Sequence, residues 1–168
     1  MLWDMRAAAR DPIQTLKDAS SSITSMSILS STLYTSSLDG HIRTYDLRLG
    51  KMIDDLVGHP ITSLAQSKIG DTVLVSSSDG NLRVFDTANG SCLQTMKGHK
   101  VGQTRTKAVW GYGESSVIAG DEDGKVWAWD VLEGKVVGSA PLDAHKRAIT
   151  WVEVNPNGKE MVTASLGE

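Results

Sequence analysis

The side chains of this chain that could do chemistry are a histidine, a serine and an aspartate that recur together. His59, Ser77 and Asp79 form the fullest set, and a hydrolase can use these residue types as base, nucleophile and orienting acid. A catalytic set occurs once in a protein, whereas this one returns at a nearly constant spacing. The repetition therefore favours a structural role, in which the side chains hydrogen-bond within each repeat. The residues that we assign to such networks are Ser37, Asp39, His59, Ser77, Asp79, His99, Asp123 and Trp129.

Other kinds of chemistry have less support in the sequence. The four histidines and the single cysteine, Cys92, are not spaced as zinc ligands are. No glycine-rich loop stands between a strand and a helix, where it could hold a phosphate group. The acidic run at 121–123 is more typical of a solvated hairpin tip than of a cation site. We therefore expect no catalytic, metal-binding or cofactor-binding residue, no cofactor and no enzymatic activity.

The elements that hold these residues follow from the spacing of the repeat. Each Asp-Gly turn precedes a short apolar strand that ends in another aspartate, and those terminal aspartates are Asp46, Asp86 and Asp130. They lie 40 and then 44 residues apart, a period typical of the four-stranded blades of a WD-type β-propeller. The strands are short and rich in β-branched residues, with glycine-containing turns between them. The sequence thus predicts an all-β, WD40-type β-propeller.

The propeller that the repeat predicts is a partial one. Three complete four-stranded blades tile residues 21–57, 61–97 and 104–142, and half-blades occupy residues 1–18 and 148–168. The first half-blade reads as third and fourth strands, and the last one as first and second strands. We expect an open arc whose unpaired strand edges favour association, rather than a small closed ring. Missing blades, or another chain, would complete the ring.

Composition and charge restrict the partners. The 17 basic and 20 acidic residues give a formal net charge of −3, which does not attract nucleic acid or anionic membranes. No apolar run is long enough to span a membrane, and the first thirty residues lack the apolar core of a signal peptide. The lone cysteine suits a reducing compartment. We expect an intracellular chain that binds proteins, with no direct nucleic-acid or membrane contact.

One face of the propeller is the candidate protein-binding surface. The loops that precede each first strand and the hairpins that carry Asp39, Asp79 and Asp123 should lie together, because strand direction reverses at each turn. Residues next to those aspartates and basic residues of the loops would form this surface. The candidates are Leu38, Ser78, Lys100, Glu122, Lys146 and Arg147.

Several segments also resemble a known family. They include Leu2-Trp3-Asp4, residues 39–50 and Lys97-Gly98-His99-Lys100, and the most specific is Tyr45-Asp46-Leu47-Arg48 in place of the usual Trp-Asp ending. The whole chain resembles the C-terminal portion of the mitogen-activated protein kinase organiser family, WD-repeat scaffolds that are also found with spliceosomes. The resemblance implies a seven-bladed propeller, of which this chain carries a little over half.

The resemblance further implies a non-enzymatic scaffold in kinase-cascade signalling or pre-mRNA splicing, located in the cytoplasm and nucleus. Its partners would be kinase-pathway or splicing proteins. The alternative is a WD-repeat adaptor of another complex, such as a ubiquitin-ligase substrate receptor. Function on such a fold resides in surface residues, which determine the partner. Purifying and identifying the bound proteins would therefore distinguish the scaffold from the adaptor.

Overall fold

The computed structural model describes residues 1–6, 10–102 and 104–167, and it consists almost entirely of antiparallel strands. Three sheets have four strands each, paired in chain order, and a fourth sheet has two. The first sheet contains β1 (Ile23–Leu29), β2 (Thr32–Ser37), β3 (His41–Asp46) and β4 (Lys51–Leu56). The second contains β5 (Ile61–Gln66), β6 (Thr72–Ser77), β7 (Leu82–Asp86) and β8 (Cys92–Met96). The third contains β9 (Ala108–Trp110), β10 (Ser116–Gly120), β11 (Lys125–Asp130) and β12 (Leu142–Asp143), with a short 3-10 helix, η1 (Tyr112–Glu114). The two-stranded sheet contains β13 (Ile149–Val154) and β14 (Met161–Ser165).

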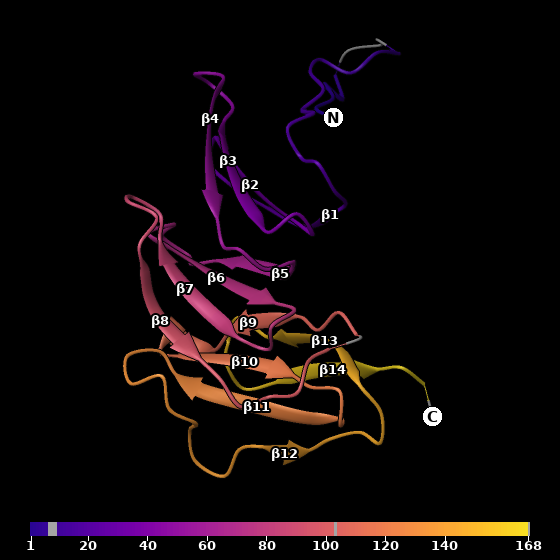
Figure 1. Ribbon diagram of the computed structural model, residues 1–168, viewed down its shortest axis with the longest axis vertical. Helices are drawn as coiled ribbons and strands as arrows, with labels where there is room; N and C mark the ends of the chain where they lie inside the picture. The colour runs from indigo at the N-terminus through magenta and orange to yellow at the C-terminus, as the bar shows by residue number, and fades with distance from the viewer. Residues whose placement is uncertain (7–9, 103, 168) are drawn as a thin grey trace.

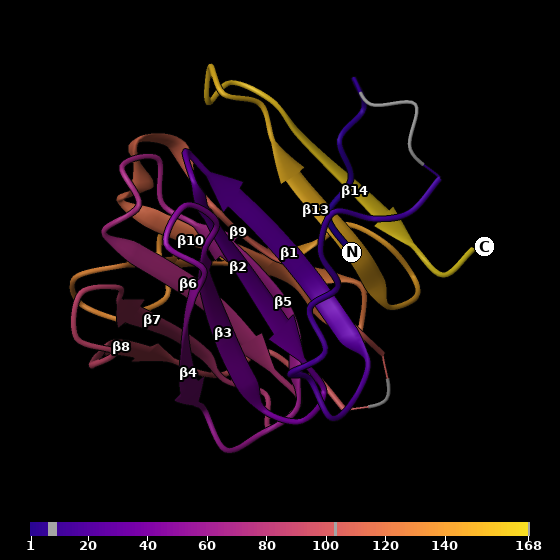
Figure 2. The same ribbon diagram turned by 90° about the horizontal axis from the view of Figure 1, so that it is seen from above.

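The sheets follow one another along an arc with their first strands on the inner side (Figure 1). The first sheet and the N-terminus lie at one end of the arc, and β13 and β14 lie at the other. Figure 2 shows from above how the first three sheets stack face to face. The predicted all-β, propeller-type fold is confirmed, and its repeat follows from local sequence: β-branched strands separated by turns with a glycine at positive φ.

The core lies between neighbouring sheets. Leu74 and Val84 of the second sheet pack with Val117 and Trp129 of the third in one buried cluster. Similar clusters join the first sheet to the second and the third to the two-stranded sheet. Each sheet is therefore stabilised by its neighbours, as expected for stacked repeats.

The N-terminal segment forms less structure than the predicted pair of strands. Leu2 and Gln14 form an isolated antiparallel bridge, with hydrogen bonds of 2.8 Å from the Leu2 amide to the Gln14 carbonyl and from the Ile13 amide to the Leu2 carbonyl. Part of each predicted half-blade lies outside the described residues. These parts are residues 7–9 of the half-blade 1–18 and residue 168 of the half-blade 148–168. The two half-blades do not pair with each other, because they stand at opposite ends of the arc (Figure 1).

The third sheet is irregular at its fourth strand. Val136 forms only an isolated bridge to Trp129. The regular strand is β12, two residues long, six residues further on. Gly138 at φ 61° and Pro141, which has no amide hydrogen, lie between the two segments and interrupt the ladder.

Candidate protein-binding face

Each hairpin between a second and a third strand is tied to the loop that precedes the first strand of its own blade. The tie is one backbone hydrogen bond of 2.8–3.0 Å, and it recurs in all three complete blades. Each hairpin therefore lies beside the first-strand loop of its own blade. The donors are the amides of Leu38, Ser78 and Glu122, and the acceptors are the carbonyls of Ser22, Pro60 and Lys100.

In the first blade, Asp39 lies at the centre of a network. The Ser20 amide and hydroxyl donate to Oδ2 at 3.0 and 3.1 Å, and the His41 amide donates to Oδ1 at 3.1 Å. The Arg43 Nη1 lies 3.0 Å from Oδ2 and completes a buried ion pair. Burial alone would raise the pKa of Asp39, but the hydrogen bonds from Ser20 and His41 outweigh it and lower that pKa to about 2. Ser20 thus takes the place of the histidine that this blade lacks, and Ser37 accepts from the Asp39 amide at 3.3 Å.

In the second blade, Asp79 has a fuller set of partners. The Ser77 hydroxyl, the Asn81 side-chain amide and the Arg83 Nη2 each donate to its carboxylate at 2.6 Å. Burial would raise the pKa of Asp79, but the hydrogen bonds from Arg83, Ser77 and Asn81 outweigh burial and hold it well below its usual range. The predicted partner His59 is a minor one, since its ring is half exposed and its Nε2 lies 3.7 Å from Oδ2.

In the third blade, the predicted chain of His99, Asp123 and Trp129 does not form. Asp123 is exposed and pairs with the Lys100 Nζ at 2.8 Å, while Trp129 donates from Nε1 to the Lys97 carbonyl at 3.1 Å. His99 is buried edge-on against the Trp129 ring, and neither ring nitrogen has a hydrogen-bond partner within the described chain. Burial lowers the pKa of His99 to about 4.

The buried carboxylate of the third blade belongs to Asp121, which occupies the position of Ser37 and Ser77. The Asp123 and Lys125 amides donate to its Oδ1 at 3.0 and 2.8 Å, and the Trp127 Nε1 donates to its Oδ2 at 2.7 Å. The carboxylate has therefore moved two residues towards the N-terminus, and a tryptophan has replaced the arginine that pairs with it.

Sequence reasoning missed Arg43, Arg83 and Trp127 as members of the networks. All three occupy the same position of the third strand and reach the carboxylate at the hairpin. A signal was present in the repeat: arginine follows the hairpin aspartate by four residues in two blades. It becomes tryptophan in the blade where an aspartate replaces the serine. The networks hold the hairpins in place.

The predicted surface residues differ in how free they are. Lys146 and Arg147 are exposed, and their side chains make no hydrogen bond or ion pair with the described residues. Glu122 is half-buried, and its Oε1 accepts from the Gly102 and Thr104 amides at 3.1 and 2.7 Å. Leu38 and Ser78 are half-buried, and Lys100 is engaged with Asp123. Of the six predicted residues, Lys146 and Arg147 are therefore the ones whose charges no described residue engages.

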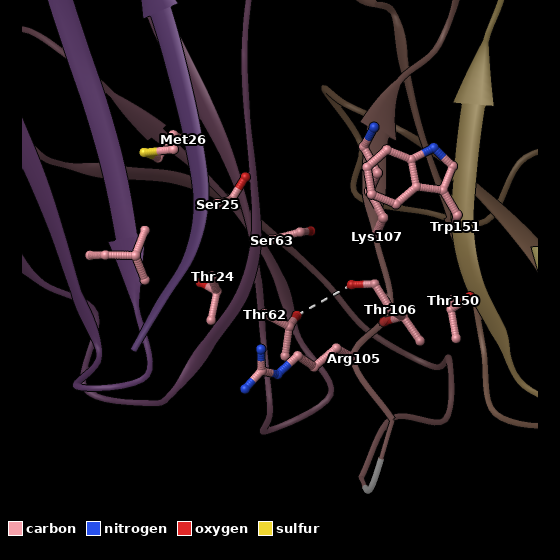
Figure 3. A pocket seen from close by; sticks show the side chains of 11 residues that line it. Thr24, Ser25, Met26, Thr62, Ser63, Arg105, Thr106, Lys107, Thr150 and Trp151 are labelled. Carbon is pink, nitrogen blue, oxygen red and sulfur yellow. Dashed lines mark hydrogen bonds between the residues drawn. The ribbon is translucent and has the colours of Figure 1, made fainter. Parts of the chain in front are cut away.

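The first strands of the four sheets enclose a groove of about 490 Å³ (Figure 3). Four threonines stand in a row across it: Thr24, Thr62 and Thr150 from first strands, and Thr106 from the segment just before β9. The Thr62 hydroxyl donates to the carbonyls of Ser76 and Thr106 at 3.2 and 3.4 Å, which ties neighbouring blades together. The row thus holds the inner wall of the arc.

Within residues 1–6, 10–102 and 104–167, no three His, Cys, Asp or Glu side chains are placed to hold a metal ion. The same ranges contain no helix long and apolar enough to cross a membrane.

These features are those of a WD-repeat propeller. A family model described as "WD domain, G-beta repeat" matches residues 10–46, 50–86 and 90–130, so the chain belongs to the WD40 repeat family. Each match begins near the fourth strand of one blade and ends with the third strand of the next. The sequence repeat is thus displaced by one strand from the structural blade. Proteins of this family are generally non-enzymatic scaffolds whose WD40 domains mediate protein–protein interactions.

Two curated relatives align with nearly all of the chain. WD repeat domain-containing protein 83 of Xenopus tropicalis is 40% identical over 96% of this chain and 51% of its own length. An uncharacterised WD repeat-containing protein of Schizosaccharomyces pombe is 33% identical over 96% of this chain and 54% of its own length. The chain thus spans about half the length of the curated relatives it matches. Mitogen-activated protein kinase organiser is an alias of the first relative, in line with the resemblance noted above.

Solved structures with the same fold include two designed proteins. The computationally designed Ika4 protein superposes with a TM-score of 0.72 at 23% identity, covering 91% of this chain and 96% of its own. The designed Ika8 protein has a TM-score of 0.73 at 23% identity and covers 90% of this chain, which spans 45% of it. At this identity they show the fold alone.

Proposed function

We propose that this chain is a non-enzymatic scaffold that binds protein partners through the face formed by its hairpins and first-strand loops. The observation that carries the proposal is the contrast between the two kinds of polar residue on that face. Asp39, Asp79 and Asp121 are used internally by the networks, whereas Lys146 and Arg147 are exposed and unpaired among the described residues. An available basic pair on a rigid support suits an acidic segment of a partner protein.

The partners that we propose belong to a kinase cascade or to the pre-mRNA splicing machinery. The support is the likeness to WD repeat domain-containing protein 83, whose alias is mitogen-activated protein kinase organiser. The proposal places the chain in the cytoplasm and nucleus, where such partners occur. The net charge of −3 speaks against nucleic acid as a direct ligand, so any role in splicing would pass through protein contacts.

A WD-repeat adaptor of another complex, such as a ubiquitin-ligase substrate receptor, is the second candidate. It uses the same face and differs only in its partner, because the fold supports either role. The eluate of an affinity purification distinguishes them. Kinase-cascade or splicing proteins support the first proposal, and cullin adaptors support the second.

The decisive experiment compares two charge reversals within the same half-blade. Lys146→Glu lies in the loop before β13, and the matched control Lys159→Glu lies in the hairpin after β13, at the opposite end of that strand. We expect the first variant to lose partners that the wild-type chain and the control retain, with unchanged circular dichroism. Equal recovery of partners by all three chains would refute this face as the binding surface.

A further inference from the structure

An apolar groove lies between the second and third sheets, which are complete blades packed against each other (Figure 1). Its volume is about 330 Å³, and Val84 and Trp110 form part of its lining. Three further apolar side chains that line it are exposed: Ile69 by 78%, Leu93 by 54% and Leu132 by 89%. One exposed leucine is ordinary on a protein surface, but three large apolar side chains around one groove are typical of a binding surface.

The leucine at position 132 is not required by the repeat. It lies in the turn after β11, where its amide donates to the Asp130 Oδ1 at 2.8 Å. The equivalent turns of the first and second blades make the same bond from the amides of Arg48 and Ala88, at 2.8 and 2.7 Å. The turn therefore forms with a charged, a small or a large apolar side chain at this position. The fold does not account for a leucine here, whereas a ligand in the adjacent groove would.

Hydrogen bonds between the two blades hold the walls of the groove. The Trp110 Nε1 donates to the Ala65 carbonyl at 3.1 Å, and the Gln94 Nε2 donates to the Leu132 carbonyl at 2.8 Å. A groove fixed in this way needs little ordering when a ligand binds, which favours affinity. Its volume lies at the lower end of the range of about 300–1,000 Å³ that ligand pockets occupy, so it suits a few side chains of a ligand.

The charged side chains that line the groove are two carboxylates, Asp71 and Glu114. Asp71 accepts from the Ser67 hydroxyl at 2.7 Å, and Glu114 accepts from the Lys68 amide of the neighbouring blade at 2.6 Å. Neither carboxylate has an ion-pair partner in the part of the chain that the structure describes. Glu114 also has a positive φ of 59°, a conformation that strains every residue except glycine. Strain of this kind gathers at functional positions, which favours a role in binding for the Glu114 carboxylate.

We propose that this groove binds a short segment of a partner protein in which a large apolar side chain stands next to a lysine or an arginine. The apolar side chain fills the groove between Leu93 and Leu132, and the basic group pairs with Asp71 and Glu114. The two carboxylates decide the occupant, because complementary charge selects a cationic partner and repels an acidic segment. A purely apolar ligand would leave both carboxylates without a counter-charge.

The groove lies on the face opposite to the candidate protein-binding face. Strand direction reverses at each turn, so the turns that follow β5 and β11 lie at one end of the strands. These turns carry Ile69 and Leu132, whereas the hairpins and loops of the candidate face, including Lys146, lie at the other end. The proposal is therefore independent of the function proposed above. The chain could hold two partners at the same time, one on each face.

The first experiment selects ligands from a phage-displayed library of random short peptides on the immobilised 168-residue chain. Peptides that also bind a Leu132→Lys chain are removed by counter-selection, because the introduced lysine fills the groove with charge and repels a basic ligand. We expect the remaining peptides to carry a leucine, isoleucine or aromatic residue next to a lysine or arginine. Enrichment of acidic peptides, or failure to find any peptide that distinguishes the two chains, would overturn the proposal.

The other wall of the groove gives an independent test with one selected peptide, measured by fluorescence anisotropy. Leu93→Ala should weaken its binding about fivefold or more, because apolar area that the peptide buries is lost. The matched control is Ile53→Ala, at a 60% exposed position in the fourth strand of the first blade, and it should bind as the wild type does. Lys146→Glu should also bind normally. If Lys146→Glu abolishes binding, or if Ile53→Ala weakens it as much as Leu93→Ala does, the peptide occupies another surface and the proposal is wrong.

The carboxylates are tested by the double variant Asp71→Asn and Glu114→Gln, which keeps both hydrogen-bond acceptors and removes both charges. We expect several-fold weaker binding of the same peptide and a smaller dependence of its affinity on salt concentration. The control Asp123→Asn with Asp143→Asn removes the same net charge from exposed side chains on the opposite face. An equal change of the salt dependence in both double variants would contradict a role for the two carboxylates.

Light scattering tests a second copy of the chain as the occupant. We expect the wild-type and Leu132→Lys chains to have the same mass in solution, because the groove receives a partner segment. A wild-type chain whose mass exceeds that of the Leu132→Lys chain would assign the groove to a second copy and overturn the proposal.

Discussion

Replacing Arg83 with methionine tests the most specific claim about the candidate face, that this arginine holds the second hairpin. Methionine keeps much of the apolar stem but removes the guanidinium, which donates to the Asp79 carboxylate at 2.6 Å and to the Ser77 hydroxyl at 2.6 Å. Both charged side chains are more than four-fifths buried. Removing one partner of a buried pair costs about 3–5 kcal/mol, and a hydrogen bond to a charged group contributes about 1.5–3 kcal/mol.

Asp79 keeps the Ser77 and Asn81 donors, so the expected loss lies at the lower end of these ranges. We expect Arg83→Met to reduce the free energy of unfolding by about 2 kcal/mol. Asp79→Ala should cost more, about 3 kcal/mol, because it leaves the Arg83 guanidinium without its carboxylate. Urea unfolding followed by circular dichroism measures both values, and the double variant gives the coupling between them.

Two control substitutions make the result interpretable. His59→Ala should change stability little, since its ring is half exposed and lies 3.7 Å from Asp79. Asp86→Ala should also cost less, because the side chain of Asp86 accepts a backbone hydrogen bond only from Ala88, in an exposed turn. If His59→Ala proves as damaging as Arg83→Met, or if the coupling between Asp79 and Arg83 is absent, the assignment of the network is wrong.

Three further predictions concern other parts of the fold. Burial lowers the pKa of His99 to about 4 from 6.5, so the unfolded chain binds a proton that the folded chain excludes. The free energy of unfolding should fall by up to about 3 kcal/mol as the pH drops from 6.5 to 4. Urea unfolding midpoints measured across this pH range should fall less for a His99→Phe variant than for the wild-type chain. Glu122→Lys should speed hydrogen exchange of the Gly102 amide without lowering the global melting temperature, since that amide donates to Glu122; unchanged exchange contradicts this. Gly40→Ala should lower the melting temperature more than Gly50→Ala, because both glycines have positive φ but only Gly40 stands against the neighbouring backbone.

The β-propeller class follows from the amino-acid sequence without reference to the fold. Strand and turn signals are local: β-branched runs such as Val73-Leu74-Val75 and the glycine turns that follow them appear within a few residues of each other. The period of the repeat then joins the local signals into blades. These features depend on backbone preferences and on the alternation of inward- and outward-facing residues along each strand. Substitution of a single residue changes neither.

The side chains that complete the networks are identified only once the chain is folded. Arg83 reaches Asp79 by folding back over a hairpin, and Trp127 reaches Asp121 in the same way, so the partner depends on side-chain geometry and burial. The predicted partner His59 points partly into solvent, although its position along the chain is appropriate. A buried carboxylate needs donors, but the sequence does not say which neighbour supplies them.

The ends of the arc show the same division between local and non-local information. Leu2 and Gln14 carry the pattern of paired strands, and β13 and β14 form as predicted. Whether a strand pair becomes a blade depends on strands from elsewhere that supply its missing hydrogen bonds and cover its apolar face. Leu64 of β5, for example, is buried by residues of the first sheet. The residue pattern is set locally, and burial is set by the neighbouring blade.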